Sequence, residues 1–165
     1  MTNFRKITEE NFDRTRSIQR MKIIVPGHKD IAACAKVYIA AYKVEPWNEI
    51  YEVSEVERYI CQYMNSDTKC CFVLVEDAEI KGVALGFVVP SISGPYFRVE
   101  DFCVDATAQR KGYGSCFMEL LLKEVAKMGC DSVLLGTQKG YPSHQFYLKN
   151  GFLEIESVLL YKDVE

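Results

Sequence analysis

The segment with the most chemical content is Gln109-Arg110-Lys111-Gly112-Tyr113-Gly114, which lies between an expected strand and an expected helix. A helix N-terminus presents N–H groups without intrahelical partners and the positive end of the helix dipole. Glycines let a phosphate approach the backbone closely, and the cationic side chains of Arg110 and Lys111 stand beside them. The loop is therefore predicted to bind an anion, and a pyrophosphate fits best.

Two other phosphate-binding motifs fit this loop less well. A Walker A loop ends in Gly-Lys followed by Ser or Thr, and that ending is absent. A dinucleotide fingerprint needs a third glycine, where this chain has Phe117. It also needs an acidic ribose partner after the next strand, whereas Asp131 precedes that strand. A tight turn without a ligand is the alternative interpretation.

The seven cysteines favour neither a metal site nor a nucleophile. Their number is odd, no Cys-x-x-Cys pair occurs, and only His28 and His144 could join them as imidazole ligands, so no metal is expected. Cys103 and Cys116 have no histidine close in sequence to act as the base that a nucleophilic thiol needs. We interpret most of the cysteines as small buried side chains in a reducing cytoplasm.

The chain length of 165 residues predicts one domain, and residues 1–20, which are mostly polar, are interpreted as an N-terminal extension to a domain over 21–165. The net charge of −3 argues against nucleic-acid binding and is compatible with a cationic substrate, or with solubility alone. No apolar stretch approaches the ~20 residues that span a membrane, and no signal peptide is recognised, so the expected location is the cytoplasm.

Hydrophobic periodicity predicts the elements that position the loop. Helices are expected after Asp30 and after Ser54, each of which is a candidate N-cap. The order β-α-α-β-β-β-α-β-α-β predicts an α/β fold around a mixed sheet. The remaining expected helices cover 115–128 and 142–149, and the expected strands cover 21–25, 70–75, 80–89, 96–104, 132–135 and 152–161.

Two segments carry a family resemblance. VDATAQRKGYGSCFMELLLKEV, residues 104–125, resembles the acetyl-CoA-binding motif of GNAT acetyltransferases, and SHQFYLKNGF, residues 143–152, is similar to the C-terminal motif of that family. The resemblance is clear over 96–155 and looser over 21–95. It implies a GNAT fold, with a mixed sheet of about six to seven strands and flanking helices, and acetyl-CoA as co-substrate.

In GNAT enzymes the loop amides bind the CoA pyrophosphate. The preceding strand splays from its neighbour, and its backbone pairs with the pantetheine arm. The resemblance therefore implies a set of cofactor-binding positions in this chain. These are Phe102, Cys103, Val104, Gln109, Arg110, Lys111, Gly112, Tyr113, Gly114, Ser115 and Ser143.

Acetyl transfer to an amine needs a neutral amine, a stabilised oxyanion and a proton for the departing thiolate. The resemblance implies Tyr147 as the acid, and a phenol with an ordinary pKa near ~10 suits a thiolate leaving group. A core aromatic beside Phe146 is the alternative. The oxyanion would be held by a main-chain N–H near Phe102 or Cys103.

The base is left open between two neighbouring carboxylates. Asp101 and Glu100 are consecutive on a strand, so strict alternation points them to opposite faces. The relatives that look closest carry the acidic residue at the position of Asp101, which is expected to be a base or an amine anchor. Other branches carry it at the position of Arg98, where this chain departs from them. Glu100, or water alone, is the alternative.

Trp47 lies in the loop between the first two helices, which covers the acceptor site in GNAT enzymes. The segment EPWN also looks like aminoglycoside-acetyltransferase-like members. Trp47 is interpreted either as a substrate wall, with Glu45 or Glu49 attracting a cationic amine, or as an anchor of the loop to the core.

The expected function is transfer of acetyl from acetyl-CoA to a primary amine of a small cationic molecule. The alternatives are acetylation of a protein N-terminus or lysine, and a non-catalytic acyl-CoA-binding sensor. No metal, nucleic acid or membrane partner is expected. Many family members self-associate, so a homodimer formed through residues 1–20 is a further hypothesis.

Overall fold

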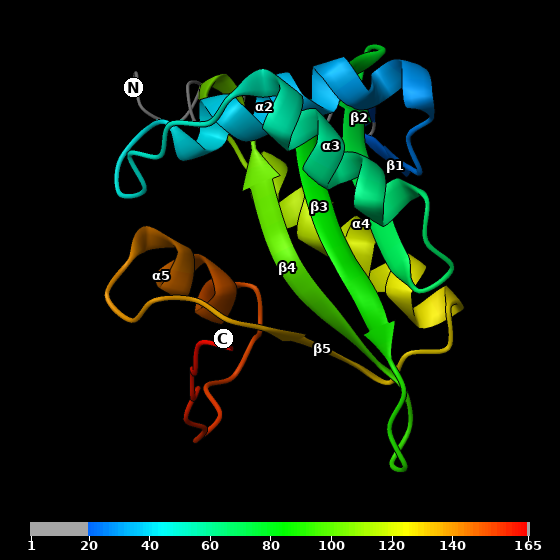
Figure 1. Ribbon diagram of the computed structural model, residues 1–165, viewed down its shortest axis with the longest axis vertical. Coiled ribbons are helices and arrows are strands. Elements are labelled where there is room, and N and C mark those ends of the chain that lie inside the picture. Colours follow the sequence, from blue (N-terminus) through cyan, green and yellow to red (C-terminus); the bar gives the residue numbers. More distant parts are fainter. Residues whose placement is uncertain (1–19, 165) are drawn as a thin grey trace, which may run out of the picture.

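The computed structural model of the chain describes residues 20–164, which form one sheet with helices on both faces (Figure 1). Of the extension expected over 1–20, all but Arg20 lies outside the described residues. The strands are β1 Lys22–Ile24, β2 Lys69–Glu76, β3 Glu79–Val89, β4 Tyr96–Val104 and β5 Ser132–Leu135. The helices are α2 Ile31–Tyr42, α3 Val53–Met64, α4 Tyr113–Lys127 and α5 Pro142–Lys149.

The sheet is mixed, as the element order predicts. Its strands lie in the order β1-β2-β3-β4-β5, with antiparallel pairing everywhere except between β4 and β5, which are parallel. Helix α4 connects these two strands, because a parallel pair needs a crossover. The loop before α4 therefore emerges at the C-terminal end of β4, the edge at which a ligand can meet the helix N-terminus.

The expectation of six to seven strands is wrong for the described residues, which contain five. The strands expected over 152–161 do not form, and this segment runs as irregular chain. Its apolar side chains are mostly exposed, with Leu153, Leu160 and Tyr161 among them. Strand preference expresses packing on neighbouring strands and faces, and this segment pairs with no strand of the described chain.

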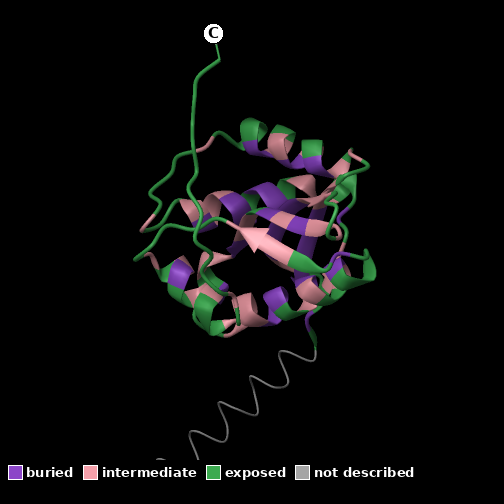
Figure 2. Cartoon of the chain, turned by 90° about the horizontal axis from the view of Figure 1, so that it is seen from below, coloured by how far each residue is buried: buried purple, intermediate pink, exposed green. Residues whose placement is uncertain are grey.

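Apolar side chains fill both faces of the sheet, and Figure 2 shows buried residues concentrated between the sheet and the helices. On the face covered by α4, Phe97 packs in one cluster with Phe117 and Leu121. On the face covered by α2 and α3, Ile60 and Leu85 belong to a second cluster. The sheet is thus held from both sides, which gives the ends of β3 and β4 fixed positions.

A β-bulge interrupts β4 near its centre. Leu85 pairs with Asp101 and Gly86 with Val99, so Glu100 is an extra residue opposite the β3 ladder. Val99 packs on the α4 side, whereas Cys103, four positions later, packs on the α2/α3 side, although regular alternation would place both on one face. A bulge re-aims the side chains that follow it. Asp101 therefore faces α2 and α3 because the strand is irregular.

Candidate active site

Strands β4 and β5 pair over four positions only and then separate. The register joins Tyr96 to Ser132 and ends with Val99 opposite Leu135, whereas β4 continues to Val104 beside β3 (Figure 1). Beyond Val99, the backbone of β4 on the β5 side faces no strand of the described chain. Unpaired backbone groups at such a position can hydrogen-bond an extended ligand. The predicted cofactor positions Phe102, Cys103 and Val104 all lie on this open stretch.

The loop at 109–114 has the backbone conformation of a close ligand approach. Gly112 caps α4 with a φ of 92°, in the left-handed region that disfavours a side chain. The first bond of the helix runs from the Cys116 N–H to the Gly112 carbonyl at 3.0 Å. The side chains of Arg110 and Lys111 are exposed beside it. This arrangement fits the pyrophosphate expected there, with a helix N-terminus and two cations.

Close packing holds this loop against α5. A Cβ on Gly114 would lie 3.1 Å from the Phe146 ring, so the glycine permits the contact. Phe102 stacks on Phe117 at a centroid distance of 5.0 Å and on Phe146 at 5.9 Å. These rings join β4, α4 and α5, and the Tyr113 hydroxyl donates to Glu76 at the end of β2 at 2.5 Å. The loop is therefore seated by its neighbours.

Smaller contacts involve two further predicted cofactor positions, Gln109 and Ser143, whereas Ser115 lies in the first turn of α4. The Gln109 amide donates to the Val104 carbonyl at 3.3 Å and so ties the loop to the end of β4. Ser143, in the first turn of α5, lies 2.9 Å from the Thr137 hydroxyl, oxygen to oxygen. The structure thus brings Gln109 to the open strand and leaves Ser143 at the start of α5.

Tyr147 projects from α5 into the group of aromatic rings beside β4. Its ring meets Phe102 edge-on at 6.4 Å and Phe152 at 5.5 Å. Burial first, and then the neighbouring Cys103 thiol and Asp101 carboxyl groups, raise the pKa of the Tyr147 phenol well above its ordinary value. The phenol therefore keeps its proton at neutral pH, as a proton donor must.

Asp101 accepts hydrogen bonds from three tyrosine hydroxyls. Tyr38 and Tyr42 of α2 donate to Oδ1 at 3.0 and 3.1 Å, and Tyr59 of α3 donates to Oδ2 at 2.7 Å. Burial first, together with the Asp101 carboxylate, raises the pKa of these three phenols above the ordinary range. We call Asp101 and these three residues the tyrosine cluster. It is a half-buried anionic point held by neutral donors.

These tyrosines were missed as site residues in the sequence. They fall on the apolar stripes of two helices, where a ring is most often a packing residue. Tyr38 and Tyr42 are four residues apart, as are Tyr59 and Tyr63, so each pair lies on one helix face. Two such pairs of tyrosines on neighbouring helices could have indicated a shared hydrogen-bond acceptor between the helices, because a buried phenol needs a hydrogen-bond partner.

Glu100 has a different environment from Asp101. It forms an ion pair with Arg98 at 2.6 Å on the same strand. The pKa of Tyr63 is raised by burial and then by the charges of both Glu100 and Asp101. Strict alternation to opposite faces, expected from their order in the chain, therefore does not hold across the bulge. Of the two carboxylates, only Asp101 accepts hydrogen bonds from the hydroxyls of the three tyrosines in the tyrosine cluster.

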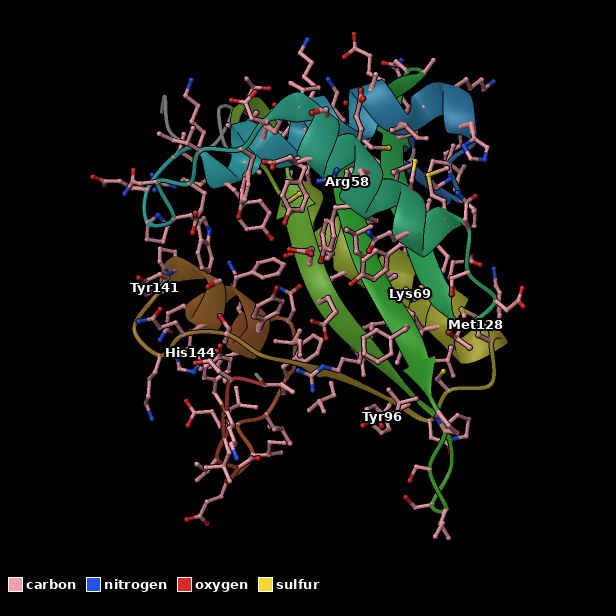
Figure 3. All side chains as sticks on the ribbon, in the orientation of Figure 1. Arg58, Lys69, Tyr96, Met128, Tyr141 and His144 are labelled. Carbon is pink, nitrogen blue, oxygen red and sulfur yellow. The ribbon has the colours of Figure 1, made fainter. Side chains whose placement is uncertain are left out.

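The loop after α2 lies beside the tyrosine cluster. The Trp47 ring meets Tyr42 at a centroid distance of 5.8 Å and Tyr141, at the N-terminus of α5, at 5.4 Å. Figure 3 labels Tyr141 where α5 begins, on the side of this loop. The side chains of Glu45 and Glu49 are exposed on the loop. Trp47 therefore packs on Tyr42, whose hydroxyl donates to Asp101, whereas the side chains of both glutamates lie in solvent.

Cysteine and histidine chemistry lies outside this arrangement. Burial raises the pKa of the Cys103 thiol, so the sulfur beside the site stays protonated. His144 is buried and contacts Glu154, Nε2 to Oε1, at 2.7 Å. Over residues 20–164 no group of three or more potential ligands is placed to hold a metal ion. No helix in that range is long and apolar enough to cross a membrane.

Comparison with known proteins identifies the class of this fold and site. Residues 36–152 match the sequence model of the acetyltransferase (GNAT) family, and the chain belongs to that family. Members of the family use acetyl-CoA as co-substrate. A search of curated protein sequences gives no match.

Solved structures share the fold at low sequence identity. An aminoglycoside acetyltransferase from an uncultured soil metagenomic sample, in complex with sisomicin, aligns with a TM-score of 0.70 and 17% identity over 89% of this chain and 98% of its own. An aminoglycoside 6'-N-acetyltransferase from Acinetobacter haemolyticus aligns at 0.70 and 11%, over 87% and 99%. A structure described as a transcriptional regulator from Bacillus halodurans aligns at 0.72 and 19%, over 87% and 99%. These likenesses establish the fold.

Proposed function

We propose that this protein transfers acetyl from acetyl-CoA to a primary amine of a small cationic molecule, by direct attack without a covalent enzyme intermediate. One observation carries the proposal. The ring of Tyr147 meets Phe102 at a centroid distance of 6.4 Å, and Phe102 follows Asp101 on β4, so a proton donor and an anion that can hold an ammonium lie at the open end of one strand. The open backbone of β4 and the loop at 109–114 adjoin that site.

The cofactor positions follow from the geometry of the strand and the loop. The loop amides and the flanking cations would hold the pyrophosphate. The unpaired backbone of β4 would pair with the pantetheine arm, which brings the thioester toward Phe102 and Cys103. A main-chain N–H on this stretch would hold the oxyanion, in a position that needs no particular side chain.

Asp101 would act as the amine anchor. A carboxylate offers about four lone-pair positions, and three are used by the phenols, so one stays available for an ammonium N–H. In the reaction the nitrogen–carbon bond forms and the carbon–sulfur bond breaks. The ammonium nitrogen loses two protons to solvent water, and the sulfur gains one from Tyr147, which regains a proton from solvent, so that one proton is released overall.

The small-molecule class is supported by the exposed acidic loop and by two structural neighbours that are described as aminoglycoside acetyltransferases. The test combines calorimetric titration with acetyl-CoA and a thiol-release assay with a panel of amines. Micromolar binding and saturable turnover of small amines are expected. Turnover of a lysine or N-terminal peptide alone would move the acceptor to proteins, and binding without turnover of any acceptor would indicate a sensor.

A further inference from the structure

The charges and rings around Asp101 limit what kind of amine the site can take. The carboxylate of Asp101 is enclosed by the three tyrosines of the tyrosine cluster, whose hydroxyls donate to it. Glu100 is neutralised by Arg98 at 2.6 Å, and Glu45 and Glu49 are exposed, where water and salt weaken their attraction. Within the described chain, the site therefore offers one enclosed anionic point for one ammonium group.

Aromatic rings surround this anionic point. Tyr38 packs on Tyr42 at a centroid distance of 4.6 Å, and Tyr51 meets Tyr38 edge-on at 5.7 Å. Trp47 extends the group and connects it to Tyr141 on α5 at 5.4 Å. We call Tyr51, Trp47 and Tyr141 the aromatic wall. It joins the loop after α2 to the N-terminus of α5.

The wall retains surface that a ligand can cover. Trp47 is 37% exposed, and Tyr51 and Tyr141 are half-buried. The same loop exposes Val44 and Ile50, and Val53 is exposed where α3 begins. Ring edges and faces pack against other rings or aliphatic groups, and contiguous apolar surface beside a charged point is typical of a binding site. An additional cation on the acceptor would meet this apolar surface, because the Glu49 carboxylate, which after burial raises the pKa of Tyr51, is itself exposed to water and salt.

We infer that the acceptor is a monoamine with an aromatic or apolar body, of the arylalkylamine type, and that the aromatic wall selects it over polycations. The inference rests on the proposed acetyltransferase function. Its ammonium group is held by Asp101 and its body packs on Trp47 and Tyr51. Specificity then depends on the wall more than on the exposed loop charges.

The test compares kcat/KM for 2-phenylethylamine, 2-cyclohexylethylamine, spermidine and kanamycin in the thiol-release assay with the full chain. At least a tenfold preference for the two monoamines is expected, with little dependence on salt between 50 and 300 mM, conditions chosen because exposed charges are screened over that range. A preference for spermidine or kanamycin would overturn the substrate class and leave the acetyltransferase function standing. No turnover of any amine would overturn both.

Variants assign the preference to the wall. Trp47→Ala is expected to lower kcat/KM for 2-phenylethylamine at least tenfold and to leave KM for acetyl-CoA unchanged. Trp47→Phe keeps a ring and should restore most of the loss, which a folding defect would not allow. Ile92→Ala removes a fully exposed apolar side chain, at the tip of the β3–β4 connection away from the wall, and is the control. Equal losses for spermidine and 2-phenylethylamine in Trp47→Ala would contradict selection by the wall.

Discussion

The hydroxyl of Tyr59 donates a 2.7 Å hydrogen bond to Oδ2 of Asp101, which joins helix α3 to the centre of β4. The carboxylate faces α3 because the strand bulges at Glu100. Position and orientation of the anionic point therefore depend on contacts between residues 42 positions apart. This bond is the shortest of the three that hold Asp101, and removing it tests the role of the cluster.

Tyr59→Phe is expected to lower kcat/KM for the amine by about tenfold, because a hydrogen bond to a charged group contributes about 1.5–3 kcal/mol. The acetyl-CoA affinity should not change. Tyr63→Phe is the matched control, since its hydroxyl lies 3.3 Å from that of Tyr59 and does not reach Asp101. Steady-state kinetics of both variants decide the matter. Equal effects of the two changes would remove the special role of the bond to Asp101.

Tyr147→Phe is expected to lower kcat by about a hundredfold, at the low end for general acid catalysis because a thiolate is a good leaving group. Binding of acetyl-CoA, measured by calorimetry, should persist. The pKa of Tyr147 is raised, so the phenol stays protonated between pH 7 and ~10. kcat/KM should therefore rise with pH as the amine loses its proton, without a fall below pH ~10. Unchanged turnover in the variant would refute the assignment of the acid.

Gly112→Glu is expected to abolish detectable acetyl-CoA binding, because it places a side chain and a negative charge where the pyrophosphate would lie. The left-handed φ of 92° also costs a non-glycine residue about 1–2 kcal/mol of stability. Gly129→Ala carries the same kind of strain, with a φ of 81° and no atom within 4 Å of the new Cβ, at the far end of α4. It should lose stability and keep binding. Loss of binding in both would trace the effect to folding.

Gly86→Ala is expected to destabilise the protein by about 1–3 kcal/mol or more, because the added methyl group overpacks the interior. Its Cβ would lie 2.4 Å from the Arg98 carbonyl oxygen and 2.6 Å from the Phe97 ring. Gly136→Ala adds a methyl group with nothing within 4 Å and serves as the control. Urea unfolding gives both free energies. A stability of Gly86→Ala equal to that of Gly136→Ala would show that the bulge can yield.

Alkaline pH is expected to destabilise the fold. The pKa values of Tyr38, Tyr42 and Tyr59 are raised in the folded state, and burial raises the pKa of Cys34 to about 12. Above pH ~8.5 for the thiols and ~10 for the phenols, the unfolded chain releases protons that the folded chain retains. The unfolded state then binds fewer protons, so the free energy of unfolding falls as pH rises.

Thermal unfolding at pH 7, 9 and 11 measures this dependence. The Tm should be lower at pH 9 than at 7, and lowest at pH 11. The variant Tyr59→Phe removes one titrating phenol and should show a smaller decrease between pH 9 and 11 than the parent protein. A Tm that does not change up to pH 11 would contradict the raised pKa values.

Local patterns determined much of this protein. The periodicity and glycine punctuation predicted β5 and α5 with the bounds that the structure has, and predicted β4 likewise. Hydrophobic periodicity and the positions of glycines depend on residues that are close together in the chain, so they can be read directly from the sequence. Helix α3 begins at Val53, whereas Ser54 was expected to cap it, because Glu52 takes the cap position. The family motifs at 104–125 and 143–152 likewise lie in contiguous segments, and the family match confirms the resemblance that they carry.

The tertiary structure decided what lies around Asp101. The three phenols come from helices distant in sequence, and the bulge that turns the carboxylate toward them arises from pairing between β3 and β4. Neither contact leaves a periodic signal. The same reason accounts for the missing strands after Phe152, since a strand exists only where another strand offers its backbone. The sequence by itself thus determined the family and the loop at 109–114 before α4, and long-range packing decided the contacts and charge around Asp101.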